Sequence, residues 1–303
     1  MSGEVLVEVA GQRLRLSNLD KVLYPDDEYT KRDVIDYYSR VAGVLAPHLA
    51  DRPVTFRRFP DGVTKPGFFE KNASRHAPDW IRTVTIETPG STTGAESLDF
   101  AILPDLPSLV WAANLAGLEL HVPQWTVGPR GAKHSPDRLV FDLDPGAPAT
   151  VVECCAVALH LRELLVADGL DPVTKTSGSK GMQVYATVTT TSPTRTSDYA
   201  KSLAERLERD HPGLVVSRMA KNLRPRKVFI DWSQNNPNKT TVAPYSLRAR
   251  PRPTASTPVT WAEVEACRTP ADLTFTADDV LDRVDEHGDL FAPLLKKGPT
   301  LPR

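Results

Sequence analysis

The chain has 303 residues, of which 40% are hydrophobic and 25% charged, and its 37 Lys and Arg nearly balance 38 Asp and Glu. This composition excludes a disordered chain and is typical of a globular protein. It has no run of about 18 apolar residues and no basic segment followed by an apolar one at the N-terminus, so we expect neither a membrane span nor an export signal. Three cysteines, two of them adjacent, exclude a disulfide framework and favour a cytoplasmic location.

Three amphipathic helices are predicted, over residues 30–49, about 148–169 and 197–211, with Thr30 and Ser197 as candidate N-caps. Short β-like runs cover residues 138–143, 172–176, 183–188 and 227–232. Helices and strands alternate without a repeat or a low-complexity linker. We therefore expect an α+β (mixed α/β) fold in which helices flank a central antiparallel or mixed sheet.

Adjacent aromatic residues, Phe68 and Phe69, lie among cations in the segment KPGFFEK, with Arg57 and Arg58 upstream. Neighbouring side chains on a regular strand point to opposite faces, so one ring could be a core residue. If both rings lie at a loop edge, they would form a platform on which bases can stack. The polar, turn-rich stretch from Glu87 to Glu96 predicts a protruding loop or hairpin tip.

Two acids follow an apolar strand in RLVFDLDPG, and a third ends the strand KVFID. Because side chains alternate along a strand, Asp142 and Asp144 point to the same face. Two carboxylates held this close favour a divalent cation such as Mg²⁺ or Mn²⁺, although Asp144 could also belong to a simple turn. With Asp231, the set is typical of a site where two metal ions align a nucleoside triphosphate with an attacking hydroxyl.

Small residues and a lysine follow a strand in TSGSKG, residues 176–181. The glycines let backbone N–H groups approach an anion, and Lys180 adds a charge, although the spacing is not that of a P-loop. Residues 218–252 contain nine basic residues and a single acid, Asp231, which indicates either a solubilising face or a surface that binds a polyanion. The acidic stretch from Asp272 to Asp289 predicts a solvated helical tail. His121 alternates with apolar residues and by pattern alone is more typical of a structural histidine.

Together, FDLDPG, TSGSKG, KVFIDWSQN and PGFFEK resemble the polymerase domain of bacterial ligase D, of the mycobacterial type in particular. This domain acts in non-homologous end joining and belongs to the archaeo-eukaryotic primase superfamily. The resemblance extends from SNLDKVLYP, residues 17–25, to the region around Gly288. It implies a primase-polymerase fold and an enzyme that fills gaps and extends 3′ ends at double-strand breaks, with ribonucleotides favoured.

The resemblance also assigns roles to residues. It implies that two Mn²⁺ or Mg²⁺ ions bind Asp142, Asp144 and Asp231, and that the incoming nucleotide contacts Ser177, Lys180, Arg248 and His121, the last counted among the catalytic residues. Phe68 and Phe69 would contact the base and template, and Lys21 and Lys31 the 5′-phosphate of a DNA end. Gln183 stands where the family commonly has histidine, and we expect it at the triphosphate with a weaker contact. Further basic contacts with DNA are expected from Arg57, Arg58, Arg224, Lys239 and Arg250.

We expect one catalytic domain over residues 1–303. Its N-terminal part, about 1–135, would contact the DNA end and template; about 136–260 would hold the metal-binding acids; and about 261–303 would form a C-terminal helical tail. No ligase or nuclease module follows residue 303, so the chain is either a stand-alone polymerase or part of a longer protein. Expected partners are DNA ends with a 5′-phosphate, nucleoside triphosphates, Ku and an ATP-dependent DNA ligase.

Other interpretations of the same residues remain. A DNA-end-binding module would keep the acids as structural residues. A haloacid-dehalogenase-like phosphatase also begins with Asp-x-Asp after a strand, but usually has Thr or Val where this chain has Gly146. A glycosyltransferase Asp-x-Asp site would leave Asp231 and the basic stretch unexplained. Extension of a primer with Mn²⁺ and four ribonucleotides would separate these interpretations.

Overall fold

The computed structural model describes residues 3–74, 76–88 and 96–302 of the chain. Its α-helices are α1 (Lys31–Arg40), α2 (Ala42–Leu49), α3 (Leu106–Asn114), α4 (Val151–Ala167), α5 (Arg195–Asp210), α6 (Trp261–Ala266) and α7 (Ala277–His287). Its strands are β1 (Val5–Val9), β2 (Gln12–Leu16), β3 (Val22–Tyr24), β4 (Tyr29–Thr30), β5 (Thr55–Arg58), β6 (Phe68–Glu70), β7 (Thr83–Glu87), β8 (Ser97–Ala101), β9 (Gly117–Val122), β10 (Arg138–Pro145), β11 (Val173–Thr176), β12 (Met182–Thr187), β13 (Val215–Val216), β14 (Val228–Asp231), β15 (Thr241–Val242) and β16 (Pro258–Val259). None of the helices in these ranges is both long and apolar enough to cross a lipid bilayer.

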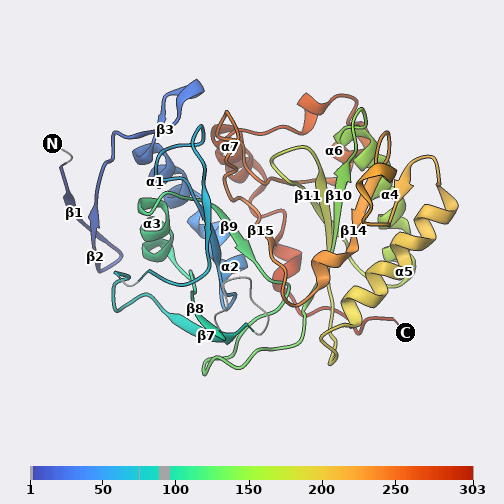
Figure 1. Ribbon diagram of the computed structural model, residues 1–303, viewed down its shortest axis with the longest axis horizontal. Coiled ribbons are helices and arrows are strands. Elements are labelled where there is room, and N and C mark those ends of the chain that lie inside the picture. Colours follow the sequence, from blue (N-terminus) through green and yellow to red (C-terminus); the bar gives the residue numbers. More distant parts are fainter. Residues whose placement is uncertain (1–2, 75, 89–95, 303) are drawn as a thin grey trace.

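A six-stranded sheet, in the order β13-β14-β10-β12-β11-β16, forms the half of the molecule drawn on the right of Figure 1. Its pairs are antiparallel except for β13 with β14. Helices α4 and α5 pack on one face, where Phe141 and Leu143 of β10 are buried with Cys154 and Cys155 of α4. The expected α+β class, the strand positions and the core placement of this cysteine pair are thus confirmed.

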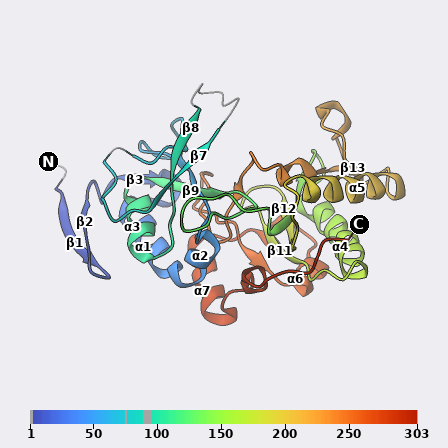
Figure 2. The ribbon, with the colours of Figure 1, turned by 90° about the horizontal axis from the view of Figure 1, so that it is seen from below.

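A four-stranded sheet, in the order β15-β9-β5-β6, forms the other half with α1, α2 and α3 (Figure 2). The strands β7 and β8 pair as an antiparallel hairpin at the position of the predicted protrusion. The tip of that prediction, residues 89–95, lies outside the described residues.

Two helix predictions need correction. Thr30 caps α1 with a capping box, as expected, but the helix ends at Arg40 and α2 begins separately at Ala42. Gly43, next to the break, weakens a continuous helix because glycine is flexible, whereas Pro47 is accommodated inside α2. Helix α5 starts at Arg195, before the expected cap.

The acidic tail is not wholly solvated. Helix α7 exposes its acids but buries Ala277, Val280 and Leu281 in the same hydrophobic core as α1. Its acids and apolar residues alternate with a helical period, so one face packs while the other meets water.

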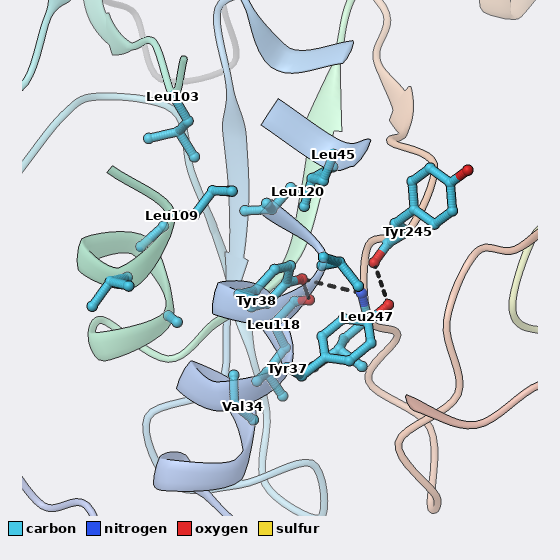
Figure 3. Close-up of a cluster of buried hydrophobic side chains, with 14 of the residues drawn as sticks. Val34, Tyr37, Tyr38, Leu45, Leu103, Leu109, Leu118, Leu120, Tyr245 and Leu247 are labelled. Carbon is cyan, nitrogen blue, oxygen red and sulfur yellow. Dashed lines mark hydrogen bonds between the residues drawn. The ribbon is translucent and has the colours of Figure 1, made fainter. Parts of the chain in front are cut away.

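The chain between Ala243 and Ala249 returns to the N-terminal half and is fixed there by two buried tyrosines (Figure 3). Tyr37 donates a hydrogen bond to the Tyr245 carbonyl at 2.7 Å. Tyr38 donates to the Leu118 carbonyl at 2.7 Å and accepts from the Leu247 N–H at 3.0 Å. These bonds hold β9 and the returning segment side by side, and both carry residues of the candidate site.

We expect Tyr38→Phe to lower the free energy of unfolding by about 1–3 kcal/mol, because a buried carbonyl and a buried N–H lose their shared partner. Urea unfolding followed by circular dichroism measures this change. Tyr29→Phe is the matched control, since its half-buried hydroxyl makes only a 3.2 Å bond to the Asp33 carbonyl. Equal losses in the two variants would contradict the assigned role of Tyr38.

Candidate active site

Three carboxylates converge on the face of the six-stranded sheet that α4 and α5 leave uncovered. Asp142 on β10 lies directly opposite Asp231 on β14, and Asp144 follows two residues along β10. Directly opposed residues on antiparallel strands have Cβ atoms about 4.5–5.5 Å apart. The three acids that the sequence separates by almost 90 positions are therefore neighbours.

The pKa of the Asp142 carboxyl is raised to about 7, mainly by burial and then by the nearby charge of Asp144. The hydrogen bond from Gln183 acts in the opposite direction. Burial and Asp231 likewise raise the pKa of Asp144, which lies closer to the exposed end of the strand. Like charges held in a partly buried site favour a cation among them. The oxygen-only donor set suits a hard divalent ion such as Mg²⁺ or Mn²⁺.

The third carboxylate, Asp231, is hydrogen-bonded to the residues that directly follow it in the chain. Asp231 accepts hydrogen bonds from the Ser233 N–H at 3.1 Å and from Gln234 Nε2 at 2.8 Å. Consistent with this, the described residues contain no group of three His, Cys, Asp or Glu side chains arranged as a complete metal site. Over the ranges that the structure describes, Asp142 and Asp144 have carboxylate oxygens without such local partners, whereas both oxygens of Asp231 accept hydrogen bonds from the turn that follows it.

Two of the expected basic residues flank the acids. The Arg224 guanidinium lies 3.8 Å from the centre of the Phe229 ring, and its charge acts on Asp144. Lys239 Nζ lies 3.9 Å from Asp231 Oδ2 and also bonds to Ser233 Oγ. Arg250, in contrast, is exposed, and within the described chain its side chain joins none of these groups.

Gln183 lies among buried polar side chains beside Asp142. On β12, opposite Asp142, its Nε2 donates to Asp142 Oδ1 at 3.0 Å, while its Oε1 accepts from Lys175 Nζ at 2.6 Å. Both ends of the amide are thus engaged inside the protein, and only 3% of the residue is exposed. In the structure without ligands, Gln183 thus contacts a carboxylate, and its expected contact with a triphosphate stays a prediction.

The segment Ser177–Gly181 forms a tight loop beside β10. Ser177 Oγ accepts the Gly181 N–H at 3.2 Å, and Arg248 Nη1 donates to the Ser177 carbonyl at 2.6 Å. Gly178 has φ +65°, and a Cβ there would meet the Ala255 backbone at 2.5 Å; a Cβ at Gly181 would meet the Leu143 carbonyl at 2.0 Å. The loop needs both glycines, and it leaves Lys180 exposed.

A second cluster lies on the four-stranded sheet around Glu119 of β9, which is 1% exposed. Its carboxylate lies 3.1 Å from Arg57 Nη1, 3.4 Å from Arg248 Nε and 2.9 Å from His121 Nε2. Burial alone would raise the pKa of Glu119, but the His121 hydrogen bond and the Arg248 charge lower it to about 2. Burial lowers the pKa of His121, against the opposing effect of Glu119.

The two adjacent phenylalanines are both exposed, at 46% for Phe68 and 61% for Phe69, on the edge strand β6. They point to opposite faces. Phe69 lies 5.8 Å from the His121 ring and 5.6 Å from the Arg57 guanidinium, whereas Phe68 lies 5.4 Å from that of Arg58. Neither ring is a core residue, and only Phe69 belongs to the Glu119 cluster.

On the Phe68 side, Lys21, Lys31 and Arg58 line a cavity of about 270 Å³. Lys31 Nζ donates to the Ser17 carbonyl at 2.7 Å, and Lys21 pairs with exposed Asp61 at 2.7 Å. Burial, then the charges of Arg58 and Lys21, lower the pKa of Lys31 to about 8. Three cations that share one cavity suit an anion.

Sequence reasoning missed Glu119, Lys175 and Gln234. Glu119 is two residues from His121 on the same strand, so alternation could have placed it on the same face. Lys175 looked like an ordinary strand residue, because nothing local shows that its ammonium group is buried. Gln234 reaches Asp231 only because the chain turns directly after β14, and the sequence alone does not show the geometry of that turn.

Known proteins support the resemblance to a polymerase domain. The family model of the LigD primase-polymerase domain matches residues 30–291. The chain belongs to this family. LigD primase-polymerase domains are nucleotidyltransferases, so the predicted family and enzyme class are confirmed.

Relatives in the LigD family agree with the fold. Over 289 residues the chain is 44% identical to the multifunctional non-homologous end joining protein LigD of Mycolicibacterium smegmatis, covering 95% of this chain and 37% of that protein. It is 32% identical to the bifunctional LigD of Bacillus subtilis, covering 91% and 43%. The solved polymerase domain of Mycobacterium tuberculosis ligase D in complex with DNA matches with a TM-score of 0.86 at 42% identity, covering 94% and 98%. The chain thus spans less than half the length of these full LigD proteins.

We expect Glu119→Gln to lower the free energy of unfolding at pH 7 by about 1.5–3 kcal/mol, because two arginines lose their shared buried anion. The native pKa of Glu119 lies below its ordinary 4.5. Its contribution is therefore complete above about pH 5 and is lost as the pH falls toward 2. Urea unfolding at pH 7 and pH 3.5 should show the two proteins converging at the lower pH.

Glu265→Gln is the control, since it breaks an exposed pair with Arg162 and should cost less than about 1 kcal/mol. A Glu119→Gln protein as stable as this control at pH 7 would contradict the central role of the Glu119 carboxylate.

Proposed function

We propose that this chain is a template-directed polymerase that fills gaps and extends 3′ ends at DNA double-strand breaks in non-homologous end joining. The observation that carries the proposal is the register of β10 and β14, which sets Asp142 opposite Asp231 with Asp144 on the same face. Family membership adds support, as does a relative whose polymerase domain was solved with DNA. Ku and an ATP-dependent DNA ligase are the partners we expect, since the relatives carry non-homologous end joining in their names.

Asp142, Asp144 and Asp231 would hold two divalent ions, Mn²⁺ or Mg²⁺. When bound, these ions supply charge neutralisation for the triphosphate and align the attacking 3′-hydroxyl. Arg224 and Lys239 flank the acids and limit the repulsion among them.

The triphosphate would lie between the two sheets. Lys180 is exposed at the tip of the 177–181 loop, and the Arg248 guanidinium joins that loop to Glu119. His121 bonds to Glu119 through Nε2, which leaves its other ring nitrogen for the nucleotide. The exposed Phe69 ring beside His121 offers a face for the base. We also expect ribonucleotides to be favoured.

The cavity of Lys21, Lys31 and Arg58 would bind the 5′-phosphate of the downstream strand. Phe68 lies at the same face of β6 and could stack on the template near that end. These two positions support the proposed division into an N-terminal DNA-contacting part and a later catalytic part. In space the parts interleave, because β15 pairs with β9 and α7 packs on α1.

Asp142→Ala and Asp144→Ala should each reduce primer extension with Mn²⁺ and four ribonucleotides by at least about 10³-fold, the scale of charge stabilisation in phosphoryl transfer. Binding of gapped DNA, measured by fluorescence anisotropy without metal, should stay close to that of the wild type. Asp171→Asn, an exposed acid at the other end of β11, should keep full activity. Undiminished extension by either Ala variant would refute the proposal, and a wild type that binds DNA without extending it would indicate a binding module instead.

The preference for phosphorylated ends should depend on pH through Lys31. With a native pKa of about 8, the Lys31 amine is charged below pH 8 and becomes neutral as the pH rises toward 9. Affinity for a 5′-phosphorylated gap should therefore fall by up to about tenfold per pH unit above pH 8, whereas affinity for a 5′-hydroxyl gap stays nearly constant.

Lys31→Arg removes the titration, because arginine stays charged over this range. The decline should disappear in that variant if Lys31 causes it. A decline that persists in Lys31→Arg, or that is equal for both kinds of end, would exclude Lys31 as the group that recognises the phosphate.

A further inference from the structure

A buried lysine stands behind the carboxylates without an acid of its own. Lys175 on β11 has no exposed surface, and its Nζ donates to Gln183 Oε1 and Ser256 Oγ, each at 2.6 Å. Within the described residues it forms no ion pair. Burial of a lysine side chain in this way costs free energy unless its hydrogen bonds replace those that it loses to water.

Burial, and then the charge of Arg248, lower the pKa of Lys175 well below its usual value, and Asp142, on the far side of the Gln183 amide, opposes them. The amide oxygen of Gln183 accepts a hydrogen bond from Lys175 Nζ, and its nitrogen donates one to Asp142 Oδ1. The amide therefore bridges the two side chains in one defined orientation. A third bond, from the Tyr185 hydroxyl to Gln183 Oε1 at 3.1 Å, supports the same orientation.

We propose that Lys175 and Gln183 are positioning residues that hold the Asp142 carboxylate in the orientation in which it binds a divalent ion. This rests on the proposed metal-binding role of Asp142. Gln183 donates to Asp142 Oδ1 from the neighbouring strand and leaves Oδ2 free of that bond. Lys175 fixes the amide and polarises its N–H groups. Partners of this kind, one step removed from the metal, commonly change metal affinity by about 10–100-fold.

The bridge also accounts for the difference between this chain and the family pattern. A neutral imidazole has one donor and one acceptor nitrogen, so histidine at position 183 could make the same two bonds. A shorter amide could not span from Lys175 to Asp142, and an apolar side chain would make neither bond. The substitution of glutamine for histidine thus preserves the function of this position.

The test is an electron paramagnetic resonance titration of free Mn²⁺ against the full chain, without nucleotide. Gln183→Met, which keeps the side-chain length, should weaken Mn²⁺ binding by about 10-fold or more, and Gln183→His should restore it to near the wild-type value. In primer extension, Gln183→Met should need correspondingly more Mn²⁺, while the KM for nucleotide at saturating Mn²⁺ stays unchanged. Gln183→Asn should act as Gln183→Met does and provides the comparison if the apolar variant fails to fold.

Asp171→Asn is the control, because it removes an exposed carboxylate at the other end of β11 and leaves the bridge from Lys175 to Asp142 intact. It should bind Mn²⁺ like the wild type. Folded Gln183→Met or Gln183→Asn protein with wild-type Mn²⁺ affinity would overturn the positioning role. Asp142→Ala separates this from a failure of the proposed function: if that variant also binds Mn²⁺ normally, the metal site itself is wrongly assigned.

Discussion

The concentration of negative charge at Asp142 is the constraint on which the site depends. This half-buried carboxylate lies opposite one acid and two residues from another, so the folded protein cannot ionise all three without compensation. Arg224 supplies positive charge beside the acids, and Gln183, held from behind by Lys175, donates a hydrogen bond to Asp142. Under the proposed function, a bound divalent cation would supply the remaining compensation.

Glu119 imposes the complementary constraint on the second sheet. Its buried carboxylate pairs with two guanidinium groups that would otherwise repel one another, and it also bonds to the His121 imidazole. Arg248 belongs to both halves: its side chain reaches Glu119 and the Ser177 carbonyl, and its own carbonyl accepts the Tyr24 hydroxyl at 3.0 Å. A ligand bound by Arg248 would therefore have a fixed position relative to both sheets.

The sequence predicted what is local and missed what depends on register. Alternation along β10 placed Asp142 and Asp144 on one face, and the strand boundaries agree within two residues. No local pattern shows that position 183 faces a carboxylate and position 175 lies behind it, because strand pairing determines both. The contacts of Gln183 with Asp142 and Lys175 were missed for the same reason: a motif transfers the position of a residue, but its hydrogen-bond partners come from distant segments.

The edge strand β6 directs its two phenylalanines, Phe68 and Phe69, toward different groups of residues. Successive Cα atoms on a strand are about 3.8 Å apart, yet their side chains point to opposite faces. Phe69 therefore lies with Arg57 and His121 in the Glu119 cluster, whereas Phe68 lies with Arg58, which lines the cavity of Lys21 and Lys31. A template that reaches both must pass around the free edge of β6. Under the proposed function, this places the incoming nucleotide and the downstream 5′-phosphate on the two sides of one strand, a geometry that suits short gaps.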